Sequence, residues 1–170
     1  MRPEALTGWL ARVFGTTRPK KAAPPPPLER ATPLARGRIA AYLARRGYRY
    51  LVDDDGDLTG TWDGSRFWFL LLGDHNEIVQ VRGRWHRTLP VAQRSALLLA
   101  ANDWNRERIW PKVYLREEDG ELALYSEVSV DLENGVTDTQ LAQLLACGLG
   151  TGVQTFSALD SLLPEPPAQP

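Results

Sequence analysis

The sequence predicts an α+β domain in which one antiparallel β-sheet, built from a meander and a hairpin, packs against three α-helices. Two patterns support this fold class. Short runs with alternating apolar residues are separated by Asp-Gly pairs, which is typical of hairpin strands. Three longer stretches repeat apolar residues every three or four positions, as helices with one buried face do. The expected order is α-β-β-β(-β)-α-β-β-α, and the fourth strand is the least defined.

The hairpin over residues 112–130 has the most specific signal. A two-residue loop, Asp119-Gly120, suits a type I′ turn because both of its central residues need a positive φ. Counting outward from this turn places Lys112 opposite Glu127 and Tyr114 opposite Tyr125 on one face. The other face is aliphatic and is expected to meet helices; it consists of Val113, Leu115, Leu122, Leu124, Val128 and Val130.

Four strand-like runs precede this hairpin, with Asp55-Gly56 and Asp63-Gly64 between the first three. They cover residues 48–53, 58–62, 66–72 and 77–84. If both Asp-Gly pairs are two-residue loops, one face carries Leu51, Leu58, Trp62, Phe67, Phe69 and Leu71. The opposite face then carries Tyr48, Tyr50, Val52, Trp68, Leu70 and Leu72. In the fourth run, a period of two leaves open whether Ile78 or the pair Val79 and Val81 points inward.

Three stretches carry helix start and stop signals. The first is 33–46, with Thr32 as N-cap, Pro33 as first helical residue and Gly47 after its end. The second is 89–108, opened by Pro90, and its expected buried stripe is Val91, Leu97, Leu98, Ala101 and Trp104. The third is 138–163; Thr137 and Gln140 before it have capping-box spacing, and Pro164 ends it.

Residues 1–30 are predicted to be an appendage to a single domain over 31–163, and residues 164–170 to be a disordered Pro-rich tail. The first 30 residues hold six Lys/Arg and two Glu, a charge of +4, whereas the other 14 basic and 19 acidic residues give −5. Pro24–Pro27 predicts an extended, semi-rigid spacer. Before it, residues 5–15 carry the apolar stripe of a short amphipathic helix, formed by Leu6, Trp9, Leu10, Val13 and Phe14.

This stripe predicts a detachable docking helix, for which three surfaces are open: this domain, another protein, or an anionic membrane. Contact with a membrane should be weak and reversible, because the helix is short and has few basic residues. We favour protein. The alternative is a passive tail, since a helix of this length is marginal by itself.

Composition favours the cytoplasm and disfavours nucleic acid. Arg82, Arg84 and Arg87 surround Trp85 and could make a stacking platform for a single strand, but the body of the chain is acidic. Cys147 is the only cysteine, so no intramolecular disulfide can form. The sequence has no leader pattern and no apolar run of membrane-spanning length. We therefore expect a protein of the reducing cytoplasm.

No motif predicts catalysis, a metal or a cofactor. The acidic run at 53–57 begins like a calcium loop, but glycine comes at its fourth position and Gly64 stands where the bidentate Glu should be. The glycines at 148, 150 and 152 lie in a helical pattern without a preceding strand, so close helix packing explains them better than phosphate binding. His75, His86 and Cys147 form no catalytic or zinc set with their sequence neighbours, although assembly in space stays open.

Four segments resemble those of a known family in order and spacing. They are Asn102–Asn105, Trp110–Tyr114, Glu127–Asp131 and residues 135–141. On these segments, residues 31–163 resemble the YbjN-domain family of bacterial sensory transduction regulators, whose fold is similar to that of type III secretion chaperones. The resemblance implies the same order of elements, binding of extended or helical protein segments, and frequent dimerisation. It implies no catalytic residues.

We therefore predict a non-catalytic, chaperone-like or regulatory protein-binding module that binds a protein segment or a second copy. Its expected contact residues are the sheet aromatics Tyr48, Tyr50, Trp68, Tyr114 and Tyr125, together with the stripe of residues 5–15. The alternative is a small-ligand sensor or enzyme with a pocket where helix 89–108 meets the sheet. A shallow apolar groove would favour the first interpretation, and a polar pocket with shifted pKa values would favour the second.

Overall fold

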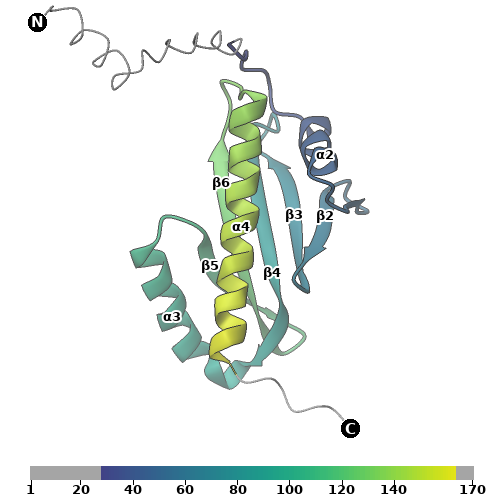
Figure 1. The fold of residues 1–170 in the computed structure, drawn as a ribbon. Coiled ribbons are helices and arrows are strands. Elements are labelled where there is room, and N and C mark those ends of the chain that lie inside the picture. The colour runs from purple at the N-terminus through teal and green to yellow at the C-terminus, as the bar shows by residue number, and fades with distance from the viewer. Residues whose placement is uncertain (1–27, 164–170) are drawn as a thin grey trace, which may run out of the picture.

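The computed structural model describes residues 28–163, which form a six-stranded antiparallel sheet with three helices (Figure 1). The spatial strand order is β1-β2-β3-β4-β6-β5. The strands are β1 (Leu51–Val52), β2 (Leu58–Trp62), β3 (Ser65–Leu72), β4 (Ile78–Pro90), β5 (Lys112–Glu118) and β6 (Glu121–Asp131). The helices are α2 (Arg36–Arg45), α3 (Arg94–Glu107) and α4 (Asp138–Leu162). The predicted fold class is confirmed, with four strands in the meander; segment 5–15 and the tail 164–170 lie outside the described residues.

The hairpin β5-β6 has the predicted turn and register. Asp119 and Gly120 both have positive φ, 52° and 81°, as a type I′ turn requires. Lys112 pairs with Glu127, and Lys112 Nζ lies 3.5 Å from Glu127 Oε1. The register extends from the turn to the start of β5, so local turn chemistry was sufficient to predict both faces of this hairpin.

The loop between β2 and β3 also has the predicted two-residue form. Asp63 and Gly64 have φ values of 46° and 77°, and Trp62 pairs with Ser65 across the turn. The β2-β3 and β5-β6 hairpins therefore both have the two-residue Asp-Gly loop that the sequence predicts.

The predicted register of β1 on β2 is wrong by one residue. Leu58 pairs with Val52, whereas a two-residue loop would have paired it with Asp53. Asp53 closes a longer loop: its carboxylate accepts a hydrogen bond from Asp57 N at 2.8 Å, and its own N–H donates to the Asp57 carbonyl. Because side chains alternate along a strand, this shift moves residues 48, 50 and 52 to the face that was predicted for Leu51.

The helices cover one face of the sheet and leave the other face open. α4 lies along β4 and β6, α2 lies beside α4 over β2 and β3, and α3 flanks β5 (Figure 1). Val79 and Val81 point into the covered face, so the open question for β4 is answered: Ile78 lies on the opposite face. The largest buried side chains of this core are Trp85, Phe67, Phe69, Ile39, Leu43, Leu58, Leu122, Leu141 and Leu145.

α4 is one continuous helix that approaches the sheet closely at two glycines. A Cβ atom on Gly148 would lie 2.8 Å from Val81 Cβ, and one on Gly152 would lie 2.7 Å from Phe67 Cε1. A Cβ on Gly150 would meet nothing within 4 Å. The packing explanation of these glycines is confirmed, and the helix has no break near Gly150.

The helix starts were predicted correctly for α4 and incorrectly for α2. Thr137 and Gln140 form the expected capping box, with two reciprocal hydrogen bonds of 3.1 Å. α2 begins at Arg36, because Thr32 forms a backbone bridge with Val136 instead of capping the helix. A long-range strand contact therefore replaces the local cap.

α3 begins later than predicted and buries less. β4 continues to Pro90, a short 3-10 turn follows at Val91–Gln93, and α3 starts at Arg94. Ala101 is the only buried residue of α3, and Leu98 of the predicted buried stripe is 44% exposed. None of the described helices is long and apolar enough to span a membrane.

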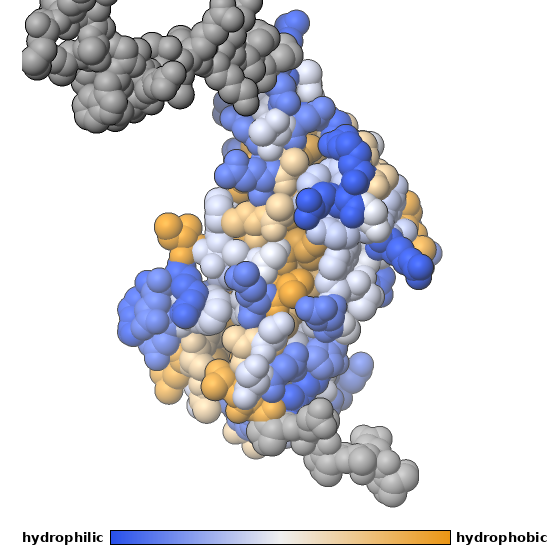
Figure 2. Space-filling view, viewed as in Figure 1, coloured by the Kyte–Doolittle hydropathy of each residue, from blue (hydrophilic) through white to orange (hydrophobic). Residues whose placement is uncertain are grey.

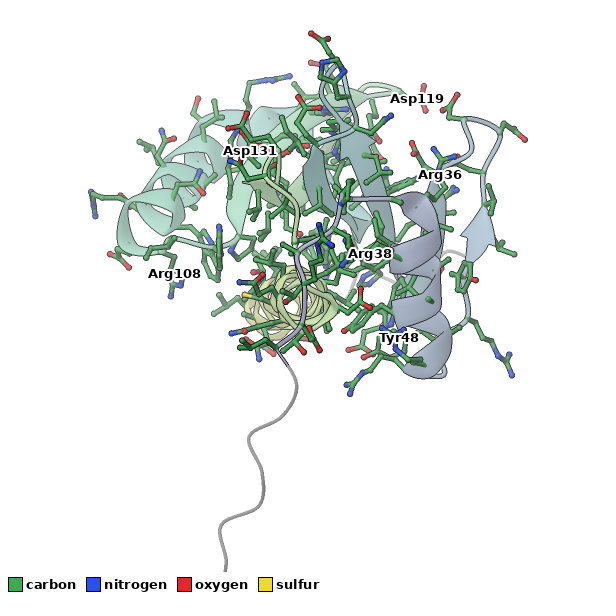
Figure 3. All side chains as sticks on the ribbon, turned by 90° about the horizontal axis from the view of Figure 1, so that it is seen from above. Arg36, Arg38, Tyr48, Arg108, Asp119 and Asp131 are labelled. Carbon is green, nitrogen blue, oxygen red and sulfur yellow. The ribbon has the colours of Figure 1, made fainter. Side chains whose placement is uncertain are left out.

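The start of the described chain is attached to the first turn of α4. Thr139 donates two hydrogen bonds to the Glu29 carboxylate, from its backbone N–H at 2.9 Å and from its hydroxyl at 2.7 Å. Arg38, on α2, bonds the Asp138 carboxylate at 2.7 Å and the Thr32 carbonyl at 2.8 Å. Figure 3, viewed from above, shows Arg38 between α2 and the end of α4. Residues 29–38 therefore have a fixed position beside this end of α4.

Candidate protein-binding surfaces

An apolar groove of about 180 Å³ runs between α3 and α4 on the covered face of the sheet. Figure 2 shows apolar residues gathered over the lower ends of these two helices. The floor is formed by Val113 and Leu124 of the sheet. The walls are Leu97, Ala100, Ala101 and Trp104 of α3, and Thr155, Ala158, Leu159 and Leu162 of α4.

The groove exists because α3 is attached to the sheet edge instead of packing against α4. Asn105 Nδ2 donates to the Val113 carbonyl and Asn105 Oδ1 accepts from Val113 N, both at 2.8 Å. Trp104 Nε1 donates to the Pro111 carbonyl at 3.1 Å, and the Arg108 guanidinium covers the Trp104 ring at 3.9 Å. These contacts hold α3 against β5 and leave its apolar side facing a space that α4 does not fill.

Large apolar side chains around the groove reach solvent. Leu162 is 79% exposed, and Leu98 and Leu99 on α3 are 44% and 67% exposed. Leu162 lines the groove, whereas Leu99, two residues after the groove residue Leu97, lies on the other side of α3. Single exposed leucines are common on protein surfaces, but exposed apolar residues that line an apolar groove are typical of an interaction site.

A second hollow of about 400 Å³ lies farther toward the N-terminal end of α4. It is lined by Leu144 and Cys147 of α4 and by Trp110 and Leu132 of neighbouring loops. Positions 144, 147, 151, 155, 158 and 162 are three or four residues apart, so this hollow and the groove lie along one stripe of α4.

The open face of the sheet carries aromatic rings covered by arginine side chains. The Tyr114 and Tyr125 rings stack with centroids 5.4 Å apart and planes inclined by 10°. The Arg116 guanidinium lies 5.5 Å and 5.0 Å from their centroids, and that of Arg66 lies 4.9 Å from the Trp68 ring. This face therefore carries aromatic rings and charged side chains, and it is not a continuous apolar patch.

The structure places the five predicted sheet aromatics on two different faces. Trp68, Tyr114 and Tyr125 lie on the open face. Tyr48 packs edge-on against Trp62 with ring centroids 5.6 Å apart, and Tyr50 is half-buried against the core. The one-residue shift of β1 is the cause. The predicted contact residues Leu6, Trp9, Leu10, Val13 and Phe14 lie outside the described residues.

A polar hollow of about 250 Å³ opens on the same open face, between the β1-β2 loop and the sheet. Arg82 lines it, and among the described residues its buried Nε has no hydrogen-bond partner. Burial, and then the charge of Asp53, raise the pKa of the Asp57 carboxyl on the facing wall. The other lining residues are Asp55, Trp68, Leu70, Arg116 and Tyr125.

Besides Asp57, two tyrosines and a second carboxylate of the open face have shifted pKa values. Burial raises the pKa of both Tyr114 and Tyr125. The Tyr125 hydroxyl donates a hydrogen bond to Glu118, which lowers the pKa of that carboxyl, and Arg84 adds an ion pair at 2.9 Å. Tyr125, Glu118 and Arg84 thus form one hydrogen-bonded group, whereas the buried Tyr114 hydroxyl has no hydrogen-bond partner among the described residues.

The fold also brings a serine, a histidine and an aspartate together from distant positions. His86 Nδ1 lies 3.4 Å from Ser65 Oγ, and His86 Nε2 lies 3.7 Å from Asp160 Oδ1. A nucleophile must be accessible, but Ser65 is 1% exposed and its Oγ accepts the His86 backbone N–H. This trio stabilises the β2-β3 end of the sheet and does not have the geometry of a hydrolase site. Among residues 28–163, no three His, Cys, Asp or Glu side chains form a metal-binding group.

Comparison with known proteins decides the family. The family model YbjN, described as "putative bacterial sensory transduction regulator", matches residues 35–161, most of the described domain. The chain belongs to the YbjN family. Comparison with curated protein sequences gives no match.

The YbjN fold is also found among solved structures. The crystal structure of YbjN from E. coli, titled a "putative transcription regulator", has a TM-score of 0.67 and 15% identity, covering 80% of this chain and 100% of that one. The HopA1–SchA chaperone–effector complex has a TM-score of 0.46 and 16% identity over 74% of this chain and 99% of the matched chain. At these identities the first likeness shows the fold alone, and the second is too distant for further argument.

The groove residues of this YbjN domain were not among the predicted contact residues. One signal was present: Leu97, Leu98 and Leu99 are consecutive, and three consecutive residues cannot all point to one side of a helix. At least one of these leucines had to face away from the sheet, so the run could have indicated an exposed apolar surface on this helix.

Proposed function

We propose that this YbjN-family domain is a non-catalytic protein-binding module that takes an apolar, helical segment of a protein into the α3–α4 groove. The groove itself is the observation that carries the proposal: its floor and walls are apolar, and it stays open because α3 is attached to β5. Amphipathic helices bind proteins by laying one apolar face into such grooves. We also place its site of action in the cytoplasm, from the single cysteine.

The shape of the groove supports a helix as the bound segment. Ala100, Ala101 and Ala158 are small, so they leave room for large side chains from a partner. Leu97 and Leu162 stand at one end of the groove and Trp104 and Thr155 at the other. Residues 155–162 span about 11 Å at 1.5 Å per residue, which matches two turns of a bound helix.

The aromatic open face is the second proposed contact surface, for a second copy or an additional part of the partner. Its support is the Tyr114–Tyr125 stack with Arg116, since Tyr and Arg are enriched where proteins bind each other. Sedimentation of the intact chain and of Arg116→Glu tests this surface. If it joins two copies, the dimer of the intact chain dissociates in the variant.

Capture experiments with matched charges test the groove. The intact chain, Ala158→Glu and Ser157→Glu are used as bait, and the captured proteins are identified and quantified. Both replaced residues are exposed on α4, but only Ala158 lines the groove. Ala158→Glu should lower capture of a specific partner at least about tenfold, which corresponds to about 1.4 kcal/mol. Equal capture by Ala158→Glu and Ser157→Glu would contradict the proposal.

The predicted alternative was a small-ligand sensor or enzyme with a pocket where helix 89–108 meets the sheet, but the pocket there is the apolar groove. A different site, the polar hollow beside Arg82 on the open face, supports a small-ligand sensor as the second candidate. The hollow brings a cation with an unpartnered Nε opposite Asp53, Asp55 and Asp57, above the Trp68 ring. This arrangement fits a small molecule that carries both charges. Thermal unfolding of the intact chain and of Arg82→Met against amino acids and other zwitterions tests the alternative. A ligand that raises the melting temperature of the intact chain only would support it.

A further inference from the structure

We propose that residues 5–15 of this same chain occupy the α3–α4 groove and act as a built-in competitor for the partner. The inference rests on the proposed binding function of the groove. It adds that a segment of the same chain binds there when no partner is present. Three observations carry it: where the described chain begins, how far the preceding residues can reach, and how the apolar stripe fits the groove.

The starting point of the tether is fixed. Glu29 is bonded twice to Thr139, so the chain that precedes it leaves from the first turn of α4. The groove begins near Thr155 on the same helix. Sixteen residues of α-helix separate Thr139 from Thr155, which is about 24 Å, and Ala158 lies about 5 Å farther.

The tether is long enough to cover this distance. Residues 15–28 include Pro24–Pro27, and a proline-rich chain extends about 3.1 Å per residue. The segment can therefore span about 40 Å, against about 30 Å to the centre of the groove. On the way it passes the hollow with Trp110, an aromatic surface of the kind on which proline-rich chains pack.

The apolar stripe of residues 5–15 matches the groove in length and in side-chain size. From Leu6 to Phe14 a helix rises about 12 Å, and the groove walls rise about 11 Å from Thr155 to Leu162. The stripe has large side chains, and three of the eight wall residues of the groove are alanines, at positions 100, 101 and 158. Large side chains of the stripe can fill the space that these alanines leave, which gives the close packing typical of protein interiors.

Because the segment is tethered to the domain, it can occupy the groove even if its affinity for the groove is low. The effective concentration of a tethered segment is highest when the length of the linker matches the distance to the site, and it is then on the order of millimolar. A helix with a dissociation constant near that value would already fill about half of the grooves. A partner helix of micromolar affinity would displace it, so the segment sets a threshold for binding instead of blocking the site.

The route of the tether fixes the direction of the docked helix. The chain arrives from the N-terminal end of α4, so residue 15 enters at the Trp104–Thr155 end of the groove. The start of the segment then lies at the Leu97–Leu162 end. The docked helix runs antiparallel to α4, which is a specific and measurable arrangement.

Spin labels on the full-length chain test both docking and direction. In a Cys147→Ser background, one sample carries the label at Glu4→Cys and another at Thr16→Cys, two positions outside the apolar stripe. Losses of amide signal are measured by NMR over the described domain. The label at 4 should remove signals near Leu97 and Leu162, and the label at 16 should remove signals near Trp104 and Thr155.

Leu10→Glu in each labelled chain is the control, because it breaks the stripe without touching residues 28–163. It should restore the groove signals. The inference is overturned if the groove residues lose no signal, or if the losses are confined to the Trp110 hollow or to the open face. It is also overturned if Leu10→Glu does not change the losses. A second sample mixes chains that carry no spin label with spin-labelled chains. If the chains without a label lose as much signal as the labelled chains do by themselves, the segment docks onto another chain and not onto its own, which also overturns the inference. None of these results bears on capture of a partner by Ala158→Glu, so the two proposals fail separately.

Discussion

The side chain of Asn105 forms a complete pair of hydrogen bonds with one residue of the neighbouring strand, Val113. Its amide oxygen accepts the Val113 N–H and its amide nitrogen donates to the Val113 carbonyl, both at 2.8 Å. β5 is the edge strand of the sheet, so these backbone groups have no strand to pair with. Asn105 takes the place of that strand and attaches α3 to the edge.

Replacement of Asn105 by alanine should destabilise the domain and loosen α3. Two hydrogen bonds to a buried residue are lost, so we expect the free energy of unfolding to fall by about 1–3 kcal/mol. Asn102→Ala is the matched control, because Asn102 is exposed on the same helix and gains the same helix propensity. Urea unfolding measures both variants. Equal stability of the two variants would show that the hydrogen bonds between Asn105 and Val113 do not hold α3 in place.

The glycines of α4 allow a comparison in which helix propensity cancels. Gly148→Ala and Gly150→Ala each gain about 1 kcal/mol of propensity, but only the first places a Cβ against Val81, at 2.8 Å. Overpacking typically costs 1–3 kcal/mol, so Gly148→Ala should be less stable than Gly150→Ala by about that amount. Chemical denaturation of the two variants measures the difference. Gly150→Ala should be more stable than the intact chain.

The elements that were predicted correctly are those whose geometry is decided by adjacent residues. Asp119-Gly120 specifies a turn with two positive φ values, and the register of β5 and β6 follows from it. Thr137 and Gln140 satisfy each other's backbone groups within one turn of helix. In both cases the groups that define the geometry lie within four residues of one another.

The errors occur where a second partner was available. Thr32 had the sequence of an N-cap, but its backbone pairs with Val136, more than 100 residues away. Asp55-Gly56 had the sequence of a two-residue loop, but Asp53 accepts the Asp57 N–H and lengthens the loop. A sequence pattern indicates which local hydrogen bonds are favourable. It does not indicate which other group will compete for them in the folded chain.

The candidate site could be predicted only in part for the same reason. Periodicity indicates which residues of 89–108 share a face, but not where the helix is placed on the sheet. That position depends on the Asn105–Val113 contact, which the sequence pattern does not specify. The groove follows from this position, so its residues were identified only with the structure.

Asp160 should stabilise the fold through a buried tryptophan. Trp85 is fully buried, and its Nε1–H donates to Asp160 Oδ1 at 3.1 Å. Asp160→Ala leaves this N–H without its acceptor, which should cost about 1–3 kcal/mol of unfolding free energy. Asp160→Asn keeps an amide oxygen in reach and should lose less. Thermal or urea unfolding compares the two variants; equal losses would assign the effect to charge, because Arg87 also lies 3.8 Å from this carboxylate.

Glu118 should give the domain part of its dependence on acid pH. The hydrogen bond from Tyr125, followed by that from Arg84, lowers the pKa of this carboxyl in the folded protein below the ordinary value of about 4.3. Its stabilising effect is therefore fully present above the pKa of the unfolded chain and is lost as the pH falls through the folded pKa. The side chain is 31% exposed, so we expect a contribution of only about 1 kcal/mol at neutral pH.

Glu118→Gln tests this effect because glutamine has the same shape and does not titrate. The variant should be less stable than the intact chain by about 1 kcal/mol at pH 7, and the difference should shrink as the pH falls from about 5 to 3. Urea unfolding across this range measures it. Tyr125→Phe removes the principal donor, so in that background the substitution at 118 should matter less. A stability difference that does not change with pH would mean that Glu118 acts through packing and not through its charge.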